Sequence, residues 1–201
     1  MWIYGGAFKS GSSAQPIYDG VYLAQQGVVV VTFNYRVGAL GFLGGIAGLS
    51  GNYGFLDQQL ALRWVNANIT RFGGDPGRVT LAGESAGGAF VALHLLSAPA
   101  SQPLFGRAVM MSNPLGLPYK TPAQARKVGL WYLAATGCYF NLRPADCLRG
   151  KSVQEILNGE KSRYLALPTL NEGLATFITW APTIDGTVLN QRPWHRPKTA
   201  G

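Results

Sequence analysis

The stretch Gly83-Glu84-Ser85-Ala86-Gly87 has the form Gly-x-Ser-x-Gly, and it decides the fold that we expect for this chain. Residues 78–82 lead into it with the pattern of a buried strand, and residues 86–97 follow it with the pattern of a helix. The chain must therefore turn sharply at Ser85, where flanking glycines let the backbones pack closely. Such a turn exposes the serine hydroxyl and places the Ala86 amide at a helix N-terminus, where an oxyanion would form. The pattern predicts a nucleophilic serine.

Several blocks extend this signature. Around the serine lie residues 72–76 (Phe-Gly-Gly-Asp-Pro), 79–81 (Val-Thr-Leu) and 83–88 (Gly-Glu-Ser-Ala-Gly-Gly). The other blocks are residues 2–8 (Trp-Ile-Tyr-Gly-Gly-Ala-Phe), 34–38 (Asn-Tyr-Arg-Val-Gly), 41–43 (Gly-Phe-Leu), 51–52 (Gly-Asn) and 56–58 (Leu-Asp-Gln). In this order the blocks resemble the type-B carboxylesterases, the family that includes the cholinesterases. The resemblance is strong from residue 1 to about residue 150 and weaker beyond it.

The resemblance implies an α/β-hydrolase fold of the α/β class, with a mostly parallel sheet and crossover helices. The alternation of strand-like and helix-like segments agrees with this fold. The chemistry that it implies is acyl transfer, in which Ser85 attacks an ester carbonyl. The amides of Gly6, Ala7 and Ala86 would form the oxyanion hole, and Glu84 would give electrostatic support. The alternatives are that the glycine segment is a simple turn and that Glu84 is a surface acid; the presence of Ser85 favours the oxyanion and electrostatic roles.

Four further residues take expected roles from the resemblance. Tyr119 lies where the family places aromatic residues of the acyl pocket, although packing is an equally good interpretation. Ser112 matches a serine that supports the active-site residues without contacting the substrate, although it could be an ordinary hydroxyl at a strand end. Arg36 and Asp57 match a structural ion pair, which we expect to be two-pronged and largely shielded from water.

The two cysteines, Cys138 and Cys147, close a short loop and could be buried thiols, a disulfide or half of a metal site. No further Cys or nearby His supports a metal site, so we expect neither metal nor cofactor. The resemblance implies a disulfide between them. A disulfide would favour an oxidising, extracytoplasmic compartment.

The length, hydrophobic content and charge of the chain limit the kinds of protein that it can be. The chain has 201 residues, of which 47% are hydrophobic and 13% charged, which suits a soluble globular domain. No apolar run approaches the roughly 20 residues of a membrane span. The formal net charge is +8, but the basic residues are scattered and form no nucleic-acid-binding motif. We expect a small-molecule ester as the partner, and neither nucleic acid nor a membrane.

The two ends of the chain lead us to expect a partial domain. Residues 1–4 have the pattern of a buried strand, where a domain rarely begins, and residues 192–197 are irregular. We therefore interpret residues 1–201 as a single incomplete α/β-hydrolase domain, the nucleophile-bearing portion of a larger protein.

A serine nucleophile needs a base, and in this fold the triad follows the order Ser, Asp or Glu, His. His94 lies nine positions after Ser85 on the expected helix, about 13 Å along its axis, so it cannot be the base. Asp185 and His195 satisfy the order formally, but the resemblance implies a triad acid and histidine beyond the matched region. We therefore expect the chain alone to be inactive.

An alternative to an enzyme is a non-catalytic adhesion or binding relative, since the family contains proteins that kept the fold and lost the chemistry. Such relatives typically lose the serine. The presence of Ser85 and of the small residues in the glycine segment favours the enzyme.

The remaining pattern predicts further elements. We expect strands at residues 28–33, covered on both faces, and at residues 107–111, also buried. The helices that we expect lie at residues 18–26, 56–69, 121–135 and 152–159, and a loop is expected at residues 38–54. Capping boxes at residues 121–124 and 152–155 are expected to begin the last two helices, and Gly159 is expected to end the last one. In the second helix, Leu56, Leu60, Trp64 and Ile69 are expected to share one face.

Overall fold

The computed structural model describes residues 1–96, 98–114, 116, 119–161 and 178–190. Its strands are β1 (Trp2–Ile3), β2 (Thr80–Glu84) and β3 (Arg107–Met111). Its α-helices are α1 (Val21–Ala24), α2 (Gly38–Phe42), α3 (Tyr53–Asn68), α4 (Ala86–Leu96), α5 (Pro122–Ala135), α6 (Pro144–Arg149) and α7 (Val153–Glu160). Short 3-10 turns are η1 (Pro16–Tyr18), η2 (Ile69–Phe72), η3 (Pro76–Arg78) and η4 (Gln102–Leu104). The α/β class expected from the sequence is confirmed.

The three strands form a parallel sheet in the order β1-β2-β3. Glu84, the last residue of β2, pairs with Met111, the last residue of β3, and Ile3 pairs with Gly83. All three strands therefore end at the same edge of the sheet. In open parallel sheets this carboxyl edge is where ligands bind. The segments that follow the strands there are the glycine segment, Ser85 and Ser112.

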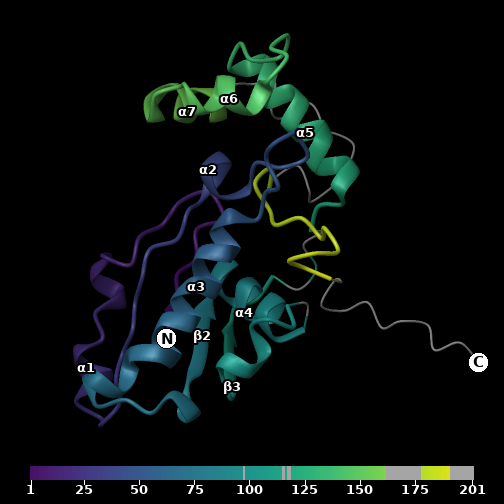
Figure 1. The fold of residues 1–201 in the computed structure, drawn as a ribbon. Coiled ribbons are helices and arrows are strands. Elements are labelled where there is room, and N and C mark those ends of the chain that lie inside the picture. Colours follow the sequence, from purple (N-terminus) through teal and green to yellow (C-terminus); the bar gives the residue numbers. More distant parts are fainter. Residues whose placement is uncertain (97, 115, 117–118, 162–177, 191–201) are drawn as a thin grey trace, which may run out of the picture.

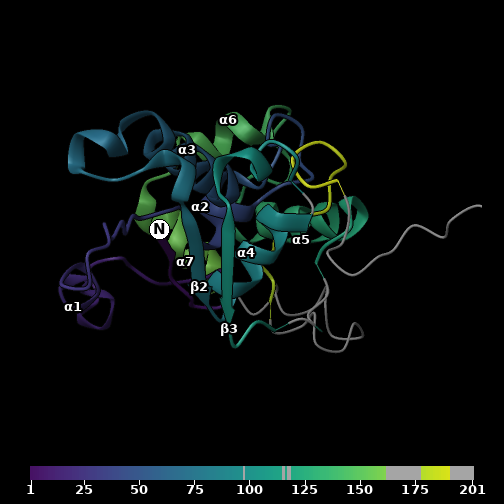
Figure 2. The ribbon, with the colours of Figure 1, turned by 90° about the horizontal axis from the view of Figure 1, so that it is seen from below.

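Helix α4 connects β2 to β3 and packs against the sheet, as Figure 2 shows beside β3. Every residue of α4 from Ala86 to His94 is buried. Phe90 is the centre of the aromatic core, with ring centroids 5.1 Å from Phe8, 5.4 Å from Tyr35 and 5.7 Å from Phe42. Such spacing suits aromatic pairs, which contribute beyond the area they bury. The helix that begins at the elbow is therefore also the main support of the core.

Helices α5, α6 and α7 form a layer away from the strands, at the top of Figure 1. Both expected capping boxes are present: Thr121 caps α5 with Gln124, and Ser152 caps α7 with Glu155. The disulfide between Cys138 and Cys147 is confirmed, with a Cα–Cα distance of 5.9 Å. It joins the end of α5 to α6.

The predicted strand at residues 28–33 is wrong. The segment makes one parallel bridge, between Trp2 and Thr32, and the Trp2 amide donates to the Val31 carbonyl at 2.8 Å. Val28 and Val29 are 52% and 41% exposed. The neighbouring β1 is only two residues long, and nothing in the described part of the chain pairs with the other edge of this segment. A β-branched run becomes a buried strand only when partners cover it.

The strand β3 was predicted correctly in position but not in burial. Val109, Met110 and Met111 are 40%, 41% and 47% exposed. The face that was predicted for α3 is also wrong, since Leu60 and Trp64 are 61% and 47% exposed. The buried face consists of Gly54, Phe55, Gln58, Gln59, Leu62 and Val65.

Three helix boundaries differ from expectation. The expected loop at residues 38–54 contains α2, and the expected helix at residues 18–26 is reduced to η1 and the four residues of α1. Helix α7 continues through Gly159 to Glu160. Gly159 does not have the left-handed backbone of a helix-ending glycine. It instead leaves room for a neighbouring side chain, since a Cβ there would lie 2.7 Å from Thr136 Cγ2.

Candidate active site

Ser85 alone makes the turn between β2, which ends at Glu84, and α4, which begins at Ala86. Its φ of 55° lies in the left-handed region. That conformation costs a residue with a Cβ roughly 1–2 kcal/mol, so its surroundings must hold it. They do: the Ser85 amide donates to the Met111 carbonyl at 3.0 Å, and the Ser85 carbonyl accepts from the Ala89 amide at 3.0 Å. The turn has the strained backbone of a nucleophile elbow.

The segment after β1 makes a tight loop, which we call the glycine loop (residues 5–10). Gly6, Ala7 and Phe8 have φ values of 126°, 54° and 63°. The Gly6 carbonyl accepts from the amides of Lys9 and Ser10 at 3.0 and 3.1 Å. Within the described ranges, neither the Gly6 nor the Ala7 amide has an acceptor. Successive amides left free in such a turn are typical of an anion-binding concavity.

The glycine loop touches the elbow. A Cβ added at Gly5 would lie 2.8 Å from the Glu84 carbonyl and 3.1 Å from the Ser85 Cβ. Only glycine permits this approach, because any side chain would push the loop away from the serine. The loop and the elbow, 80 positions apart in the chain, therefore form one site at the carboxyl edge of the sheet.

Ala86 contributes the amide at the start of α4. As the first residue of the helix it has no intrahelical acceptor, and no other acceptor occurs in the described part of the chain. The N-terminus of the eleven-residue α4 carries partial positive charge. Convergence of this amide with those of Gly6 and Ala7 on one point stays a prediction.

Glu84 lies at the same place. Its Oε2 atom is 3.0 Å from the position that a Gly5 Cβ would occupy, and the residue is half-buried. No hydrogen bond or ion pair of this carboxylate is found among the described residues. An acidic group without a cation beside the serine leaves negative potential at the site. Its predicted electrostatic role therefore stays open to test.

Ser112 and Tyr119 differ in their exposure to solvent. Ser112 follows β3, is exposed and has a φ of 47°, directly after the carbonyl that binds the Ser85 amide. Tyr119 is 1% exposed, and its hydroxyl lies 3.5 Å from the Ala89 carbonyl. Of the two interpretations of Tyr119, its burial favours packing over the acyl pocket.

Arg36 and Asp57 form the two-pronged pair. Arg36 Nε donates to Asp57 Oδ2 at 2.8 Å and Nη2 donates to Oδ1 at 2.7 Å; the Arg36 backbone amide adds a bond of 2.9 Å. Hydrogen bonding to Asp57 raises the pKa of Arg36. The expectation of shielding is wrong, because the side chains are 53% and 24% exposed. A pair this exposed stabilises by about 1 kcal/mol or less.

His94, which its position on the helix excluded as the general base, has a structural role. It is fully buried, its Nδ1 lies 2.8 Å from Ser101 Oγ, and its Nε2 lies 3.0 Å from Gln58 Oε1. Burial lowers its pKa to about 3, which keeps the ring neutral. Sequence reasoning missed its partners Gln58 and Ser101, and also Gln59, whose Nε2 donates to Ser101 Oγ at 3.0 Å. The available signal was two adjacent glutamines in an otherwise amphipathic helix.

Asp185, which has the sequence position of a triad acid between Ser85 and His195, binds the backbone amides of a turn. Its Oδ1 accepts from the amides of Thr187, Val188 and Leu189, and its Oδ2 accepts from Asn52 Nδ2 at 3.0 Å. A carboxylate with these four donors has a structural role. His195 lies outside the described residues.

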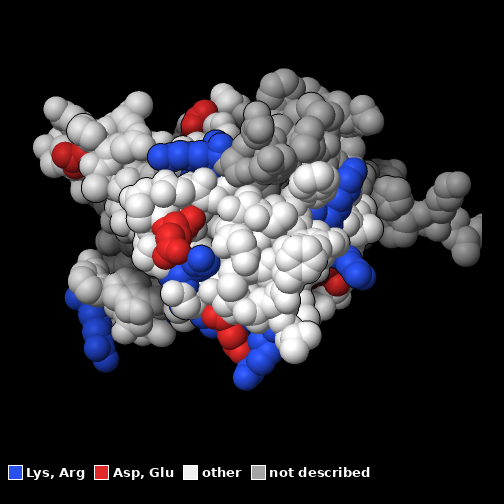
Figure 3. All heavy atoms as spheres, turned by 90° about the horizontal axis from the view of Figure 1, so that it is seen from above, with Lys and Arg blue, Asp and Glu red and all other residues white. Residues whose placement is uncertain are grey.

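We also searched the described residues for a metal site, a membrane-spanning helix and a charged surface. The described part holds no group of three or more His, Cys, Asp or Glu side chains that could bind a metal. None of its helices combines the length and hydropathy that a membrane span requires. Figure 3 shows Lys and Arg side chains scattered over one face, with Asp and Glu between them.

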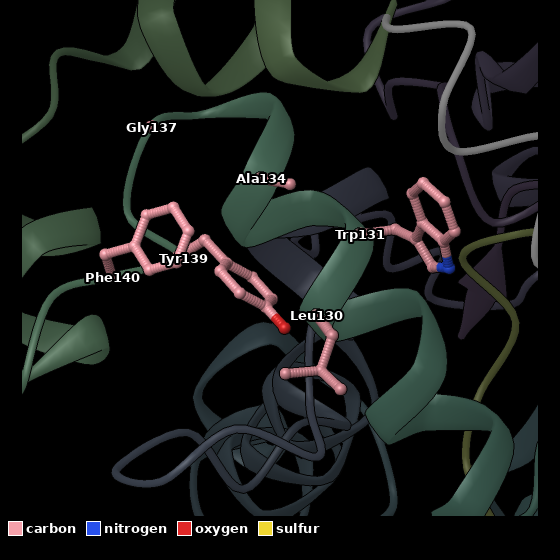
Figure 4. Close-up of a pocket in the computed structure, with 6 residues that line it drawn as sticks. All are labelled: Leu130, Trp131, Ala134, Gly137, Tyr139 and Phe140. Atoms are coloured by element: carbon pink, nitrogen blue, oxygen red, sulfur yellow. The ribbon is translucent and has the colours of Figure 1, made fainter.

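A separate apolar pocket of about 540 Å³ lies between α5 and the disulfide-closed loop. Figure 4 shows its lining residues, Leu130, Trp131, Ala134, Gly137, Tyr139 and Phe140. These residues include no carboxylate and no imidazole, so the pocket supplies no general base for Ser85.

Comparison with known proteins shows a match to one family model and similarity to several individual proteins. The family model described as "Carboxylesterase family" matches residues 1–200. The chain is 46% identical over 200 residues to a cholinesterase of Mus musculus, with 96% of this chain and 32% of the relative covered. It is likewise 46% identical over 200 residues to an acetylcholinesterase of Electrophorus electricus (96% and 30% covered). It is 44% identical over 194 residues to the "Crystal protein" of Dictyostelium discoideum (96% and 34%). The chain spans about a third of the length of these relatives.

Proposed function

Because the chain belongs to the carboxylesterase family, we propose that the full-length protein is a serine carboxylic-ester hydrolase with Ser85 as its nucleophile. The observation that carries the proposal is the left-handed Ser85 at the strand–helix turn, in contact with the glycine loop. This is the backbone geometry that exposes a serine hydroxyl beside free amides.

The reaction follows from these groups. The Ser85 hydroxyl loses its proton to a base and attacks the ester carbonyl, which forms a tetrahedral intermediate. The amides of Gly6, Ala7 and Ala86 donate to its oxyanion, and each such donor lowers the barrier by roughly 3–4 kcal/mol. The ester C–O bond then breaks, and the base gives its proton to the departing alcohol. Water, deprotonated by the same base, attacks the acyl-enzyme, and Ser85 leaves with that proton as the carboxylic acid is released. We propose that the triad acid and histidine belong to sequence beyond these residues.

Glu84 acts on the base in this proposal. Deprotonation of Ser85 places a positive charge on the histidine, and a carboxylate nearby stabilises that charge. The absence of a cation beside Glu84 in the described part of the chain supports this role. The substrate is a small-molecule ester, and the disulfide fits folding in an oxidising compartment.

A non-catalytic binding protein is the second candidate. The names of two relatives from Dictyostelium discoideum, "Crystal protein" and "cAMP-regulated D2 protein", state no hydrolytic activity. Against this candidate, both the serine and the small residues of the glycine loop are present in this chain.

A fluorophosphonate probe separates the two candidates. The full-length protein is expected to be labelled at Ser85, as read by peptide mass spectrometry, and Ser85→Ala is expected to remain unlabelled. Ser50→Ala is the matched control, because it removes an exposed hydroxyl that makes no hydrogen bond among the described residues and should still be labelled. A correctly folded protein without the adduct on Ser85 would support the binding protein.

A further inference from the structure

The side chain of Glu160, the last residue of α7, reaches the beginning of α2. Its Oε1 atom accepts a hydrogen bond from the Ala39 amide at 2.7 Å. A Cβ at Gly38 would lie 2.5 Å from the same oxygen, so the carboxylate occupies the space that a side chain would fill. The residue is half-buried. This contact joins positions 121 residues apart.

Helix α2 in turn holds the glycine loop. The Gly38 amide donates to the Phe8 carbonyl at 2.8 Å. At the other end of α2, the Phe42 ring meets the Phe8 ring edge-to-face, with centroids 6.3 Å apart. Both ends of this five-residue helix therefore contact the residue that follows the proposed oxyanion donor Ala7.

The glycine loop needs such support. Ala7 and Phe8 both have left-handed backbones, and each costs roughly 1–2 kcal/mol relative to an ordinary conformation. Strained residues of this kind persist only when their surroundings over-determine them. Burial raises the pKa of Glu160, whereas the hydrogen bond from the Ala39 amide and the charge of Lys9, which belongs to the loop, act in the opposite direction and favour the carboxylate. The loop is therefore linked to Glu160 both through α2 and by charge.

We propose that Glu160 is a positioning residue, which holds the glycine loop in its anion-binding conformation by fixing the N-terminus of α2. This inference rests on the proposed function, because it assigns the loop to the oxyanion. It makes α7, a helix far from the sheet, part of the support of the site (Figure 1).

Three substitutions separate the hydrogen bond from the charge. Glu160→Ala removes both, Glu160→Asp keeps the charge but is too short to reach the Ala39 amide, and Glu160→Gln keeps an acceptor oxygen without the charge. Gln154→Ala is the matched control, because Gln154 is an exposed residue of the same helix and bonds only to Asn158 among the described residues.

The first readout is hydrogen–deuterium exchange in the full-length protein, which needs no activity. Peptides that cover residues 5–10 should exchange about tenfold faster in Glu160→Ala and Glu160→Asp, whereas Glu160→Gln and Gln154→Ala should stay within about threefold of the wild type. Glu160→Asp keeps the test decisive where Glu160→Ala does not fold. Wild-type exchange in Glu160→Asp would overturn the proposal, as would equal exchange in the Asp and Gln variants.

The second readout is the steady-state hydrolysis of p-nitrophenyl acetate. Displaced oxyanion donors lower kcat and leave KM nearly unchanged, so Glu160→Asp should lose about tenfold in kcat with KM within twofold. Glu160→Gln should restore most of kcat. A wild-type protein that neither turns over the ester nor takes the phosphonate would refute the proposed function alone, since the exchange data still decide the role of Glu160.

Discussion

Ser85 combines two properties that substitutions can separate, a hydroxyl and a left-handed backbone. Its φ of 55° strains any residue with a Cβ, whereas glycine adopts it freely. Ser85→Gly should therefore be more stable than Ser85→Ala by about 1 kcal/mol, although both lose the nucleophile. Urea denaturation of the two full-length variants measures the difference. Equal stabilities would mean that the elbow is not strained.

His94 should make stability depend on pH. Burial lowers its pKa to about 3, while in the unfolded chain it is near 6.5. Below pH 6.5 the unfolded state binds a proton that the folded state does not, so stability is lost as pH falls from about 6.5 towards 3. The slope is up to about 1.4 kcal/mol per pH unit.

The control for this prediction is His94→Gln, which keeps hydrogen-bonding groups and does not titrate. Its stability should change less between pH 6.5 and 5 than that of the wild type, as urea denaturation would show. Lys120, whose pKa burial lowers to about 7, is present in both proteins, so its titration contributes equally to the two profiles and cancels in the comparison. Parallel pH profiles of the two proteins would contradict the prediction.

At the scale of elements, the disulfide ties the end of α5 to α6 across a sequence separation of nine. Closing so short a loop restricts the unfolded chain modestly, and its removal should cost roughly 2–3 kcal/mol. The measurement is urea denaturation of the Cys138→Ala/Cys147→Ala variant in full-length protein. Reducing the wild type should produce a similar loss. A loss below 0.5 kcal/mol in both would show that tertiary packing already fixes the loop.

Elements with local signals were predictable from the sequence. The turn at Ser85 follows from residues within a few positions, and the capping boxes at Thr121 and Ser152 follow from residues three apart. Each of these signals describes a hydrogen bond or backbone preference that a short segment satisfies by itself.

Features that depend on distant partners were not predictable in this way. The β-branched run at residues 28–33 has the composition of a buried strand, but burial requires neighbours that the described part does not supply. The face of α3 was misassigned because Gln58 and Gln59 are buried by bonds to His94 and Ser101. The contact of Glu160 with Ala39 has no local signal at all.

At the scale of the whole molecule, the 201 residues expose surface that a stable enzyme would cover. The side chains of β3 and of residues 28–29 lie about half in solvent, and Phe140 and Leu142 are 93% and 99% exposed. Exposed strand edges and apolar patches of this kind promote association. We therefore expect the isolated 201-residue chain to aggregate or remain partly unfolded, as size-exclusion chromatography with light scattering would show. A stable monomer would contradict this.

The last prediction is that the isolated chain hydrolyses activated esters very poorly. Ser85 and the amides proposed as oxyanion donors are present, but His94 has both ring nitrogens occupied, and Asp185 is saturated by four donors. A serine without its base retains at most the oxyanion and binding contribution, on the order of 10³–10⁴ over water, and only on a folded scaffold. The assay is p-nitrophenyl acetate turnover against Ser85→Ala. A rate typical of an intact esterase, abolished by Ser85→Ala, would show that a base lies within these residues, and His195→Ala would then identify it.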